Sequence, residues 1–545
     1  MKLLPILLLL VLPAVVQAQF TFTTNNGAIT ITGYNGSPTG LIIPGSTNGY
    51  LVVSIGNLAF RNKSTLTSVT IPNSVTNIGT SGFQSCSSLT NVVLGNGVIS
   101  IGDDAFLYDS RLVSATIPNS VISIGVLAFD GCSGVTNISI GSGVTSIGEQ
   151  AFIACYGLTA ITVNPANPAY SSMAGVLFNK SQTTLLQYPG GNAGNYVITN
   201  GVTSIGNNAF AFCSRLTSVD TSNSVVSIGQ SAFANSTSLT NITLGTNVSS
   251  IGAGAFNSGS SLTAITVATN NPAYSSLAGV LFNKSQTTLL QYPGGKAGSY
   301  TTPNSVTSIG DNAFAGCVNL TNITIGNSVT SIGAGAFNGS INLTNVTIGA
   351  GLTSIGYDGF DECYSLVTIT VDPLNPAYSS VAGVLFDKNQ TTLIRCPGGI
   401  AGSLTIPKSV TSIGDFAFLN DYLLNTVYFE GNAPSLGSSV FDDTLTVYFL
   451  PGTTGWTTPF GGMPAVLWNP QAQTLGVRTN KFGFNIIGSS NLVIVVEACT
   501  NLSNPTWFPL QTNTLNTFIG TNGASYFSDP QWMNYPGRFY RLRSP

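Results

Sequence analysis

A six-residue motif recurs twelve times in this chain: Ile-Gly, two variable residues, a small residue and Phe. It runs from Ile55–Phe60 to Ile413–Phe418. Most steps between the motif glycines are 23 residues, and three are 58 residues, which is 23 plus an insert of 35. A 23-residue unit cannot bury an apolar face alone and must stack on its neighbours. The period therefore predicts a solenoid with one coil per repeat.

The residues within one repeat suggest what each coil contains. In the repeat Ser308–Thr330, the segment Leu320–Ile325 alternates apolar and polar residues and is rich in β-branched side chains, which is typical of a short strand. The segment Asp311–Cys317 spaces its apolar residues three to four apart, as one or two helical turns would. We expect each coil to have a strand side and a helical side.

The segment Leu66–Cys86 carries the motif most fully, with Thr67-Ser68-Val69-Thr70-Ile71-Pro72-Asn73-Ser74-Val75 as its first half. It resembles the BspA-like branch of bacterial leucine-rich repeats, whose units read roughly Leu-x-x-Ile-x-Ile-Pro-x-Ser-Val-x-x-Ile-Gly-x-x-Ala-Phe-x-x-Cys. The resemblance covers roughly residues 50 to 430. It implies an α/β leucine-rich-repeat solenoid that is curved, on secreted or surface proteins that bind other molecules, and it supplies no catalytic residues.

The two ends of the chain differ from the repeats. Residues 1–18 have the charged start, apolar middle and small-residue exit of a secretory signal peptide, with cleavage expected after Ala18 and an extracellular or cell-surface destination. We expect an N-terminal cap at 19–55, the solenoid at 56–430 and a C-terminal cap at 431–468 that includes Trp456, Phe460 and Trp468. A small antiparallel β domain follows at 469–545, and it resembles modules that end other exported bacterial proteins. No apolar run long enough to span a membrane follows the signal.

The three inserts, approximately Asn164–Thr199, Ala268–Thr302 and Asp372–Ile406, recur at a higher period of 104 residues. Two apolar runs across the polar turn Asn179–Gln182 predict a hairpin. Tyr is common at contact surfaces, so the insert tyrosines are candidate ligand contacts; alternatively they seal the insert against neighbouring coils. These tyrosines are Tyr170, Tyr188, Tyr274, Tyr292 and Tyr378.

The alternating strands leave a row of polar, almost uncharged side chains facing outward. Such a surface can hydrogen-bond a neutral glycan or a protein's amides without charge steering, although Thr and Ser also simply suit an exposed strand. The candidate binding residues on this face are Asn241, Thr243, Asn322, Thr324, Asn345 and Thr347.

Eight cysteines in an exported chain raise the question of disulfides. Six of them follow the motif Phe by three residues, a position that faces the core of a stack, where a free thiol behaves as a small hydrophobe. Among these six, only Cys132 and Cys155 lie in neighbouring coils and could form a bridge; buried free thiols are the other reading. Cys396 and Cys499 have no obvious partner.

Composition removes several function classes. Charged residues are 6% of the chain and the net charge is −3, so no basic surface exists for nucleic acid. With no histidine, Ser-His-Asp and Cys-His catalysis and histidine-based zinc sites are excluded. The adjacent acids Asp103–Asp104, Asp361–Glu362 and Asp442–Asp443 fit solvated turns better than a catalytic pair. We nominate no catalytic, cofactor or metal residues.

The sequence leaves three functions open. The first is a secreted or surface binding protein, adhesin-like and non-enzymatic, with a protein or glycan as partner. The second is a structural spacer or surface-layer component attached through its C-terminal module. The third is an accessory carbohydrate-binding protein.

Overall fold

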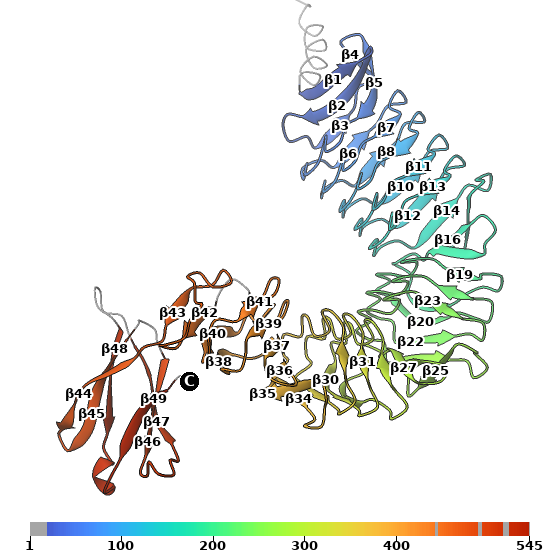
Figure 1. Ribbon diagram of the computed structural model, residues 1–545. Coiled ribbons are helices and arrows are strands. Elements are labelled where there is room, and N and C mark those ends of the chain that lie inside the picture. The colour runs from blue at the N-terminus through green and yellow to red at the C-terminus, as the bar shows by residue number, and fades with distance from the viewer. Residues whose placement is uncertain (1–18, 442–444, 489–492, 516–522, 544–545) are drawn as a thin grey trace, which may run out of the picture. The chain divides into compact units, whose positions relative to one another are not determined.

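The computed structural model describes residues 19–441, 445–488, 493–515 and 523–543. The expected signal peptide and the acidic pair Asp442–Asp443 lie outside these ranges. The chain divides into two compact units, many of whose strands are labelled in Figure 1. The first contains the described residues up to Ala297 together with Gly310–Asn319, and the second contains Gly298–Ile309 and the residues from Leu320 onward.

Each repeat forms one coil of a β-solenoid and contributes a longer and a shorter strand to two parallel ladders. The register advances by one repeat per coil: Ser100 lies beside Ser123, and Ala115 beside Ile138. The leucine-rich-repeat solenoid expected from the sequence is confirmed.

The strands of the first unit are as follows. The longer strands are β3 (Gly40–Ile42), β6 (Ser68–Thr70), β8 (Asn91–Val93), β10 (Ser114–Ile117), β12 (Asn137–Ile140), β14 (Ala160–Val163), β18 (Gly194–Val197), β20 (Leu216–Asp220), β22 (Asn241–Leu244) and β24 (Ala264–Val267). The shorter ladder contains β5 (Tyr50–Ile55), β7 (Asn77–Ile78), β9 (Ser100–Ile101), β11 (Ser123–Ile124), β13 (Ser146–Ile147), β19 (Ser204–Ile205), β21 (Ser227–Ile228) and β23 (Ser250–Ile251). At its start, β2 (Ala28–Tyr34) pairs with β5, β1 (Phe20–Asn25) with β2, and β4 (Ser46–Thr47) with β5.

The second unit repeats the scheme. Its longer strands are β28 (Gly298–Thr301), β30 (Leu320–Ile325), β32 (Asn345–Ile348), β34 (Thr368–Val371), β38 (Gly402–Ile406), β40 (Leu424–Phe429), β42 (Thr446–Phe449) and β43 (Ala465–Leu467). Its shorter strands are β29 (Ser308–Ile309), β31 (Ser331–Ile332), β33 (Ser354–Ile355), β39 (Ser412–Ile413) and β41 (Ser435–Leu436).

The segment between the two strands of a coil is a run of turns, so the expected helical side is wrong. The amide of Phe60 donates to the carbonyl oxygen of Gly82 in the next coil at 2.8 Å, and the amides of Leu58 and Asn62 make equivalent bonds. In a helix these amides would bond four residues back in their own segment. Leu58 and Asn62 have φ of 60° and 61°, which excludes a right-handed helix. Among the described residues the only helical element is the 3₁₀ turn η1 (Trp532–Asn534).

The motif phenylalanines form the centre of the core. In the first unit, Phe60, Phe83, Phe106, Phe129 and Phe152 stack in a column with ring centroids 4.9 to 6.0 Å apart. In these five coils each phenylalanine thus packs on its equivalent in the next, a repeated aromatic contact that adds to the apolar area buried.

The cysteines are all buried and free. The thiol of Cys132 donates to the carbonyl oxygen of Phe106 at 3.1 Å, and that of Cys155 to Phe129 at 3.2 Å. Ser236 makes the same bond to Phe210 at 2.6 Å. The position therefore places a hydrogen-bond donor against the preceding coil, and Cys132 and Cys155 are not bridged.

Each insert forms a three-stranded antiparallel meander. The strands are β15 (Tyr170–Met173), β16 (Val176–Asn179) and β17 (Thr184–Gln187), with β25 (Tyr274–Leu277), β26 (Val280–Asn283) and β27 (Thr288–Gln291) in the second insert and β35 (Tyr378–Val381), β36 (Val384–Asp387) and β37 (Thr392–Arg395) in the third.

The last two strands of each meander are the expected hairpin. Its turn is held by Asn179, whose Oδ1 accepts from the amides of Thr183 and Thr184. β17 pairs in parallel with β19, and β18 with β20, so the second half of the insert completes a further coil. Leu185 of β17 pairs with Ile205 of β19, so the insert's own coil has 20 residues and the remaining 15 residues form the excursion (35 − 20 = 15).

The C-terminal region is a small all-β module, as expected. Its two three-stranded sheets are β44 (Gln471–Arg478), β45 (Lys481–Gly488) and β48 (Gly523–Asp529), and β47 (Phe508–Thr514), β46 (Val493–Cys499) and β49 (Phe539–Arg543). A cluster of buried side chains joins Tyr428, Tyr448 and Trp468 to Phe484 and Phe527 of this module. Trp456 stacks on Phe449 at 5.0 Å and, with Phe460, covers the last coils.

Candidate functional site

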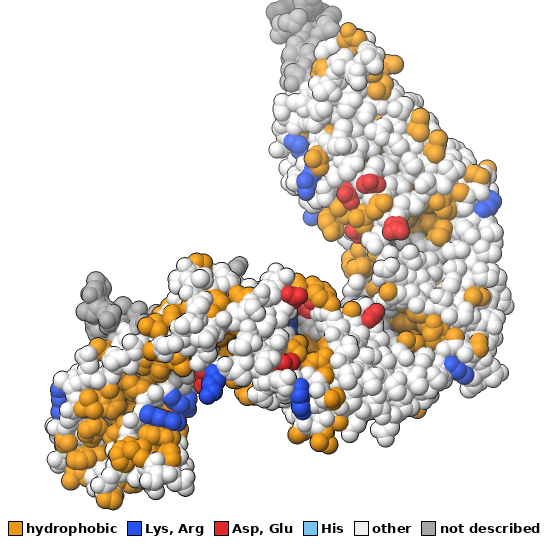
Figure 2. Space-filling view, viewed as in Figure 1, with side chains coloured by type: hydrophobic (Ala, Val, Ile, Leu, Met, Phe, Trp, Pro, Cys, Tyr) orange, Lys and Arg blue, Asp and Glu red, His pale blue; other side chains and the backbone are white. Residues whose placement is uncertain are grey.

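The six candidate residues predicted on the longer strands all lie on the outward face of those strands. Thr324, Asn345 and Thr347 are exposed, whereas Asn241, Thr243 and Asn322 are half-buried. Asn322 lies beside Asn345, and Thr324 beside Thr347, in the parallel register. On the side of the molecule that Figure 2 shows, acidic and basic side chains are few over the repeats.

The asparagines of this face use part of their hydrogen-bonding capacity on one another. Asn345 Nδ2 donates to Asn322 Oδ1 at 2.8 Å, and Asn322 Nδ2 donates to Ser299 Oγ at 3.2 Å. Asn241 Oδ1 accepts from Thr266 at 3.4 Å. The face is therefore a pre-ordered polar ladder, and a ligand there would meet side chains already fixed in place.

The insert tyrosines separate into two groups, and the first belongs to the core. Tyr188 and Tyr292 are 4% and 1% exposed. Tyr188 stacks on Phe210 at 5.0 Å and Tyr292 on Phe314 at 5.1 Å, so each occupies the phenylalanine place of the insert's own coil. Burial leaves neither ring a surface for a ligand, and Cys396 holds the equivalent place in the third insert.

The second group, Tyr170, Tyr274 and Tyr378, is half-buried and terminates the shorter ladder. The hydroxyl of Tyr170 accepts a hydrogen bond from the amide of Ile147 at 3.1 Å, at the last residue of β13. Burial raises the pKa of all three tyrosines, and the bond from the backbone amide partly opposes this rise. These tyrosines therefore cover the end of the shorter ladder, which is the sealing role that the sequence left open. Each of them also borders one of the hollows described below.

A fully buried asparagine fixes each insert to the coil before it. Asn167 Nδ2 donates to the carbonyl oxygens of Gly141 and Val144, both at 2.9 Å, and its Oδ1 accepts from the amides of Ala169 and Tyr170. Asn271 and Asn375 make the same four bonds. Sequence reasoning missed these residues, although their place in the repeated Asn-Pro-Ala-Tyr phrase was a signal.

A hollow lies beside each of the three half-buried tyrosines because the insert's coil is short. Phe152 follows Ile147 by five residues, whereas Tyr188 follows Leu185 by three, so the turn segment of the insert has two residues fewer than its neighbour. The missing backbone leaves a gap in the turn ladder. We call these gaps the first, second and third insert hollows, next to Tyr170, Tyr274 and Tyr378; their volumes are about 210, 160 and 170 Å³.

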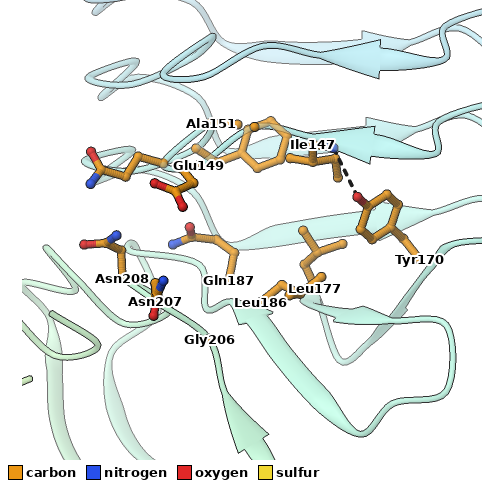
Figure 3. A pocket seen from close by; sticks show the side chains of 13 residues that line it. Ile147, Glu149, Ala151, Tyr170, Leu177, Leu186, Gln187, Gly206, Asn207 and Asn208 are labelled. Carbon is orange, nitrogen blue, oxygen red and sulfur yellow. Dashed lines mark hydrogen bonds between the residues drawn. The ribbon is translucent and has the colours of Figure 1, made fainter. Parts of the chain in front are cut away.

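The first insert hollow has a polar and an apolar end (Figure 3). Glu149, Gln187 and Asn208 gather at one end, and Tyr170 and Leu177 form the other. Gln187 is 8% exposed, and its Nε2 donates to the carbonyl oxygen of Tyr188 at 3.1 Å. The hollow thus offers hydrogen-bonding groups next to an aliphatic and aromatic wall, an arrangement typical of small-ligand sites.

The other two hollows keep the wall and vary the polar end. Gln291 replaces Gln187 in the second, and Arg395 in the third. Arg395 is 9% exposed and donates to the carbonyl oxygens of Phe416 and Leu419, with Asp361 at 3.7 Å. Its Nε has no hydrogen-bond partner among the described residues.

No cluster of three His, Cys, Asp or Glu that could hold a metal occurs within the described ranges. No helix among the described residues is long and apolar enough to cross a membrane. Asp361 of the predicted surface pairs instead bonds Asn420 at 2.8 Å and lies near Arg395.

Comparison with known proteins gives matches over the repeats. The model of the BspA-type leucine-rich repeat region matches in six copies, at residues 53–181, 188–297, 292–401 and 400–450. No curated protein matches the chain.

Three solved structures are similar to it. A leucine-rich cell surface protein of Faecalibacterium prausnitzii is 27% identical over 75% of this chain and 86% of its own, with a TM-score of 0.37. A leucine-rich-repeat protein of Eubacterium ventriosum is 22% identical over 65% and 89%, with a TM-score of 0.45. One of Bacteroides ovatus is 25% identical over 64% and 92%, with a TM-score of 0.31.

Proposed function

Because the chain belongs to the BspA-type leucine-rich-repeat family, we propose that it is an exported or cell-surface binding protein, adhesin-like and without enzymatic activity. Its partner is an extracellular protein or glycan, engaged through the longer-strand face and the inserts. The observation that carries this proposal is the outward row of amides and hydroxyls, pre-ordered across neighbouring strands and nearly free of charge. Such a row suits a neutral hydrogen-bonding partner.

A spacer or surface-layer role is the second candidate, and one observation favours it. The C-terminal module exposes large apolar side chains, among them Phe508 at 61%, Leu475 at 63% and Met533 at 67%. Exposed apolar groups in one module are a common feature of attachment surfaces. On this reading the module attaches the protein to a surface, and the repeats extend from it and bind nothing themselves.

The test is binding of the full chain to a glycan array and to a panel of extracellular-matrix proteins at physiological salt. We expect saturable binding that changes little between low and physiological salt, because the face carries few charges. Replacing Thr324, Asn345 and Thr347 by Ala should weaken protein or glycan binding through the face while the fold remains intact by circular dichroism. Saturable binding to neither panel would reject the binding role and favour the spacer.

A further inference from the structure

We propose that the three insert hollows are equivalent sites for sugar residues of a neutral polysaccharide, so that one polymer chain occupies more than one hollow. This inference rests on the proposed binding function and narrows it to one ligand class and one set of residues. It concerns the hollows beside Tyr170, Tyr274 and Tyr378, not the longer-strand face.

Each hollow contains a backbone amide whose equivalent in regular coils donates a hydrogen bond to the next coil. In regular coils the amide two residues after the motif Gly donates to the next coil, as Leu127 does to Glu149 at 3.1 Å and Asn208 to Gln230 at 3.0 Å. The equivalent amides beside the hollows are those of Gln150, Gly254 and Asp358. Within the described residues no acceptor contacts these three amides. Gly254 and Asp358 are half-buried and Gln150 is exposed, so each hollow presents an open backbone donor to an oxygen acceptor.

Acidic side chains, which accept hydrogen bonds, also line each hollow. Glu149 lines the first hollow, Asp311 the second, and Asp358 with Asp415 the third. Buried side-chain nitrogens of Gln187, Gln291 and Arg395 add further donors at the same end. A hydroxyl both donates and accepts, so it can satisfy the carboxylate and the amide together. A lysine side chain only donates and would leave the backbone amides unpaired.

The charge and the volume of the hollows restrict the kind of ligand. Counting lining residues, each hollow has a net charge of −1: Glu149 in the first, Asp311 in the second, and Asp358 and Asp415 less Arg395 in the third. This disfavours sulfated, phosphorylated or carboxylated ligands. The wall of Leu and Tyr side chains suits the apolar face of a sugar ring, and the volumes admit one ring rather than a drug-sized molecule, for which pockets begin at about 300 Å³.

The hollows repeat at a regular spacing along the chain. The hollows return every 104 residues, and four ladder steps, roughly 20 Å along the coils at about 4.8 Å each, separate the first from the second within one unit. Near-identical sites in fixed register fit a partner that is itself a repeat of identical units. Binding at two such sites by one chain raises affinity through effective concentration.

The experiment fills the hollows in the full chain. Leu186, Leu290 and Ile394 line the three hollows from half-buried positions, so Leu186→Trp, Leu290→Trp and Ile394→Trp extend into the open space. Ile99→Trp is the matched control, since Ile99 is exposed at 44% and lies outside both the hollows and the longer strands. The probes are amylose, mannan and a β-1,3-glucan, with heparin and polylysine as charged comparators. Circular dichroism checks folding.

We expect at least one neutral polymer to bind, and the triple variant to lose its binding by about tenfold or more while Ile99→Trp keeps it. A short oligosaccharide of the same sugar should bind with a stoichiometry of three that falls to two in Leu186→Trp. Should the triple variant not fold, Glu149→Ala tests the first hollow alone, because Ala253 already holds that place in the second.

Neutral-glycan binding that the filling variants leave unchanged would overturn the hollows while leaving the binding function in place. Binding of polylysine or heparin alone, or of a matrix protein alone, would overturn the ligand class. Binding to none of these probes or panels would reject the proposed function as well.

Discussion

The third residue after the motif phenylalanine is a buried hydrogen-bond donor in several coils. Cys86, Cys132, Cys155 and Ser236 all donate there to a backbone carbonyl of the preceding coil. The sequence placed these side chains in the core, but it suggested only small apolar groups. Hydrogen bonding explains why serine replaces cysteine at this place. Asp109, which is also fully buried, puts a carboxyl there instead.

Asp109 should be protonated in the folded protein. Its Oδ1 accepts from the amide of Cys86 at 2.7 Å, its Oδ2 has no partner among the described residues, and burial raises its pKa well above the usual range. A raised folded pKa means that stability is full below the unfolded value, near 3.9, and falls as pH rises toward the folded value.

Asp109→Asn should therefore stabilise the fold at pH 7 by about 1–3 kcal/mol and have little effect near pH 3. Urea unfolding at both pH values measures this. The matched change Ser236→Asp should destabilise at pH 7, since it puts a carboxyl where a hydroxyl now donates. A gain for Asp109→Asn that is the same at both pH values would contradict the protonated state.

At the scale of elements, the sequence predicted strands well and turns poorly. Alternation in Leu320–Ile325 has one reading, and the strand β30 has those bounds. Apolar spacing of three to four residues has two readings, helix or successive turns, and the positive φ of residues such as Asp104 and Tyr108 leaves no mark in composition. The turns prevail because their amides bond the next coil, an interaction that only stacking reveals.

The sequence likewise predicted only part of the candidate site. The tyrosines were found by their repetition, yet the pattern could not separate Tyr188, in the phenylalanine column, from Tyr170, at a ladder end. The hollows were missed because they arise from two absent residues in a turn. Counting from Leu185 to Tyr188 against Ile147 to Phe152 would have exposed the difference.

The asparagine that fixes each insert is the element most open to test. Asn271→Ala removes four hydrogen bonds and leaves two carbonyls and two amides unpaired in a buried site. We expect a loss of about 2–5 kcal/mol in unfolding free energy, measured by chemical denaturation. Asn345→Ala on the exposed face should cost under about 1 kcal/mol. Equal losses in the two variants would show that the insert is held by other contacts.

At the scale of the whole molecule, the 104-residue period is the unit of construction. Val163 and Val267 precede the first and second inserts at equivalent positions, each at the end of a longer strand. Everything between them is one insert with its following coils. Because coils contact mainly their immediate neighbours, stability is close to a sum over coils and interfaces.

Deleting residues 164–267 should accordingly give a shorter protein that still folds, since Val163 then meets Ala268 as Val267 does now. The β-rich circular dichroism spectrum and a cooperative thermal transition should persist, with one insert hollow fewer. A deletion of residues 164–255, which breaks the period, is the control and should unfold or aggregate. Similar behaviour of the two would mean that register across the junction is unimportant.

The near-identity of the inserts has a consequence for heredity. Gene segments that encode the same phrase every 104 codons are natural partners for unequal crossing-over, and every such exchange adds or removes a complete, correctly phased block. The number of tyrosine-lined hollows can thus change by one in a single generation, with no intermediate that fails to fold. On the proposed function, copy number alone would then set how strongly the protein holds a polymeric ligand, with each individual contact left as it was.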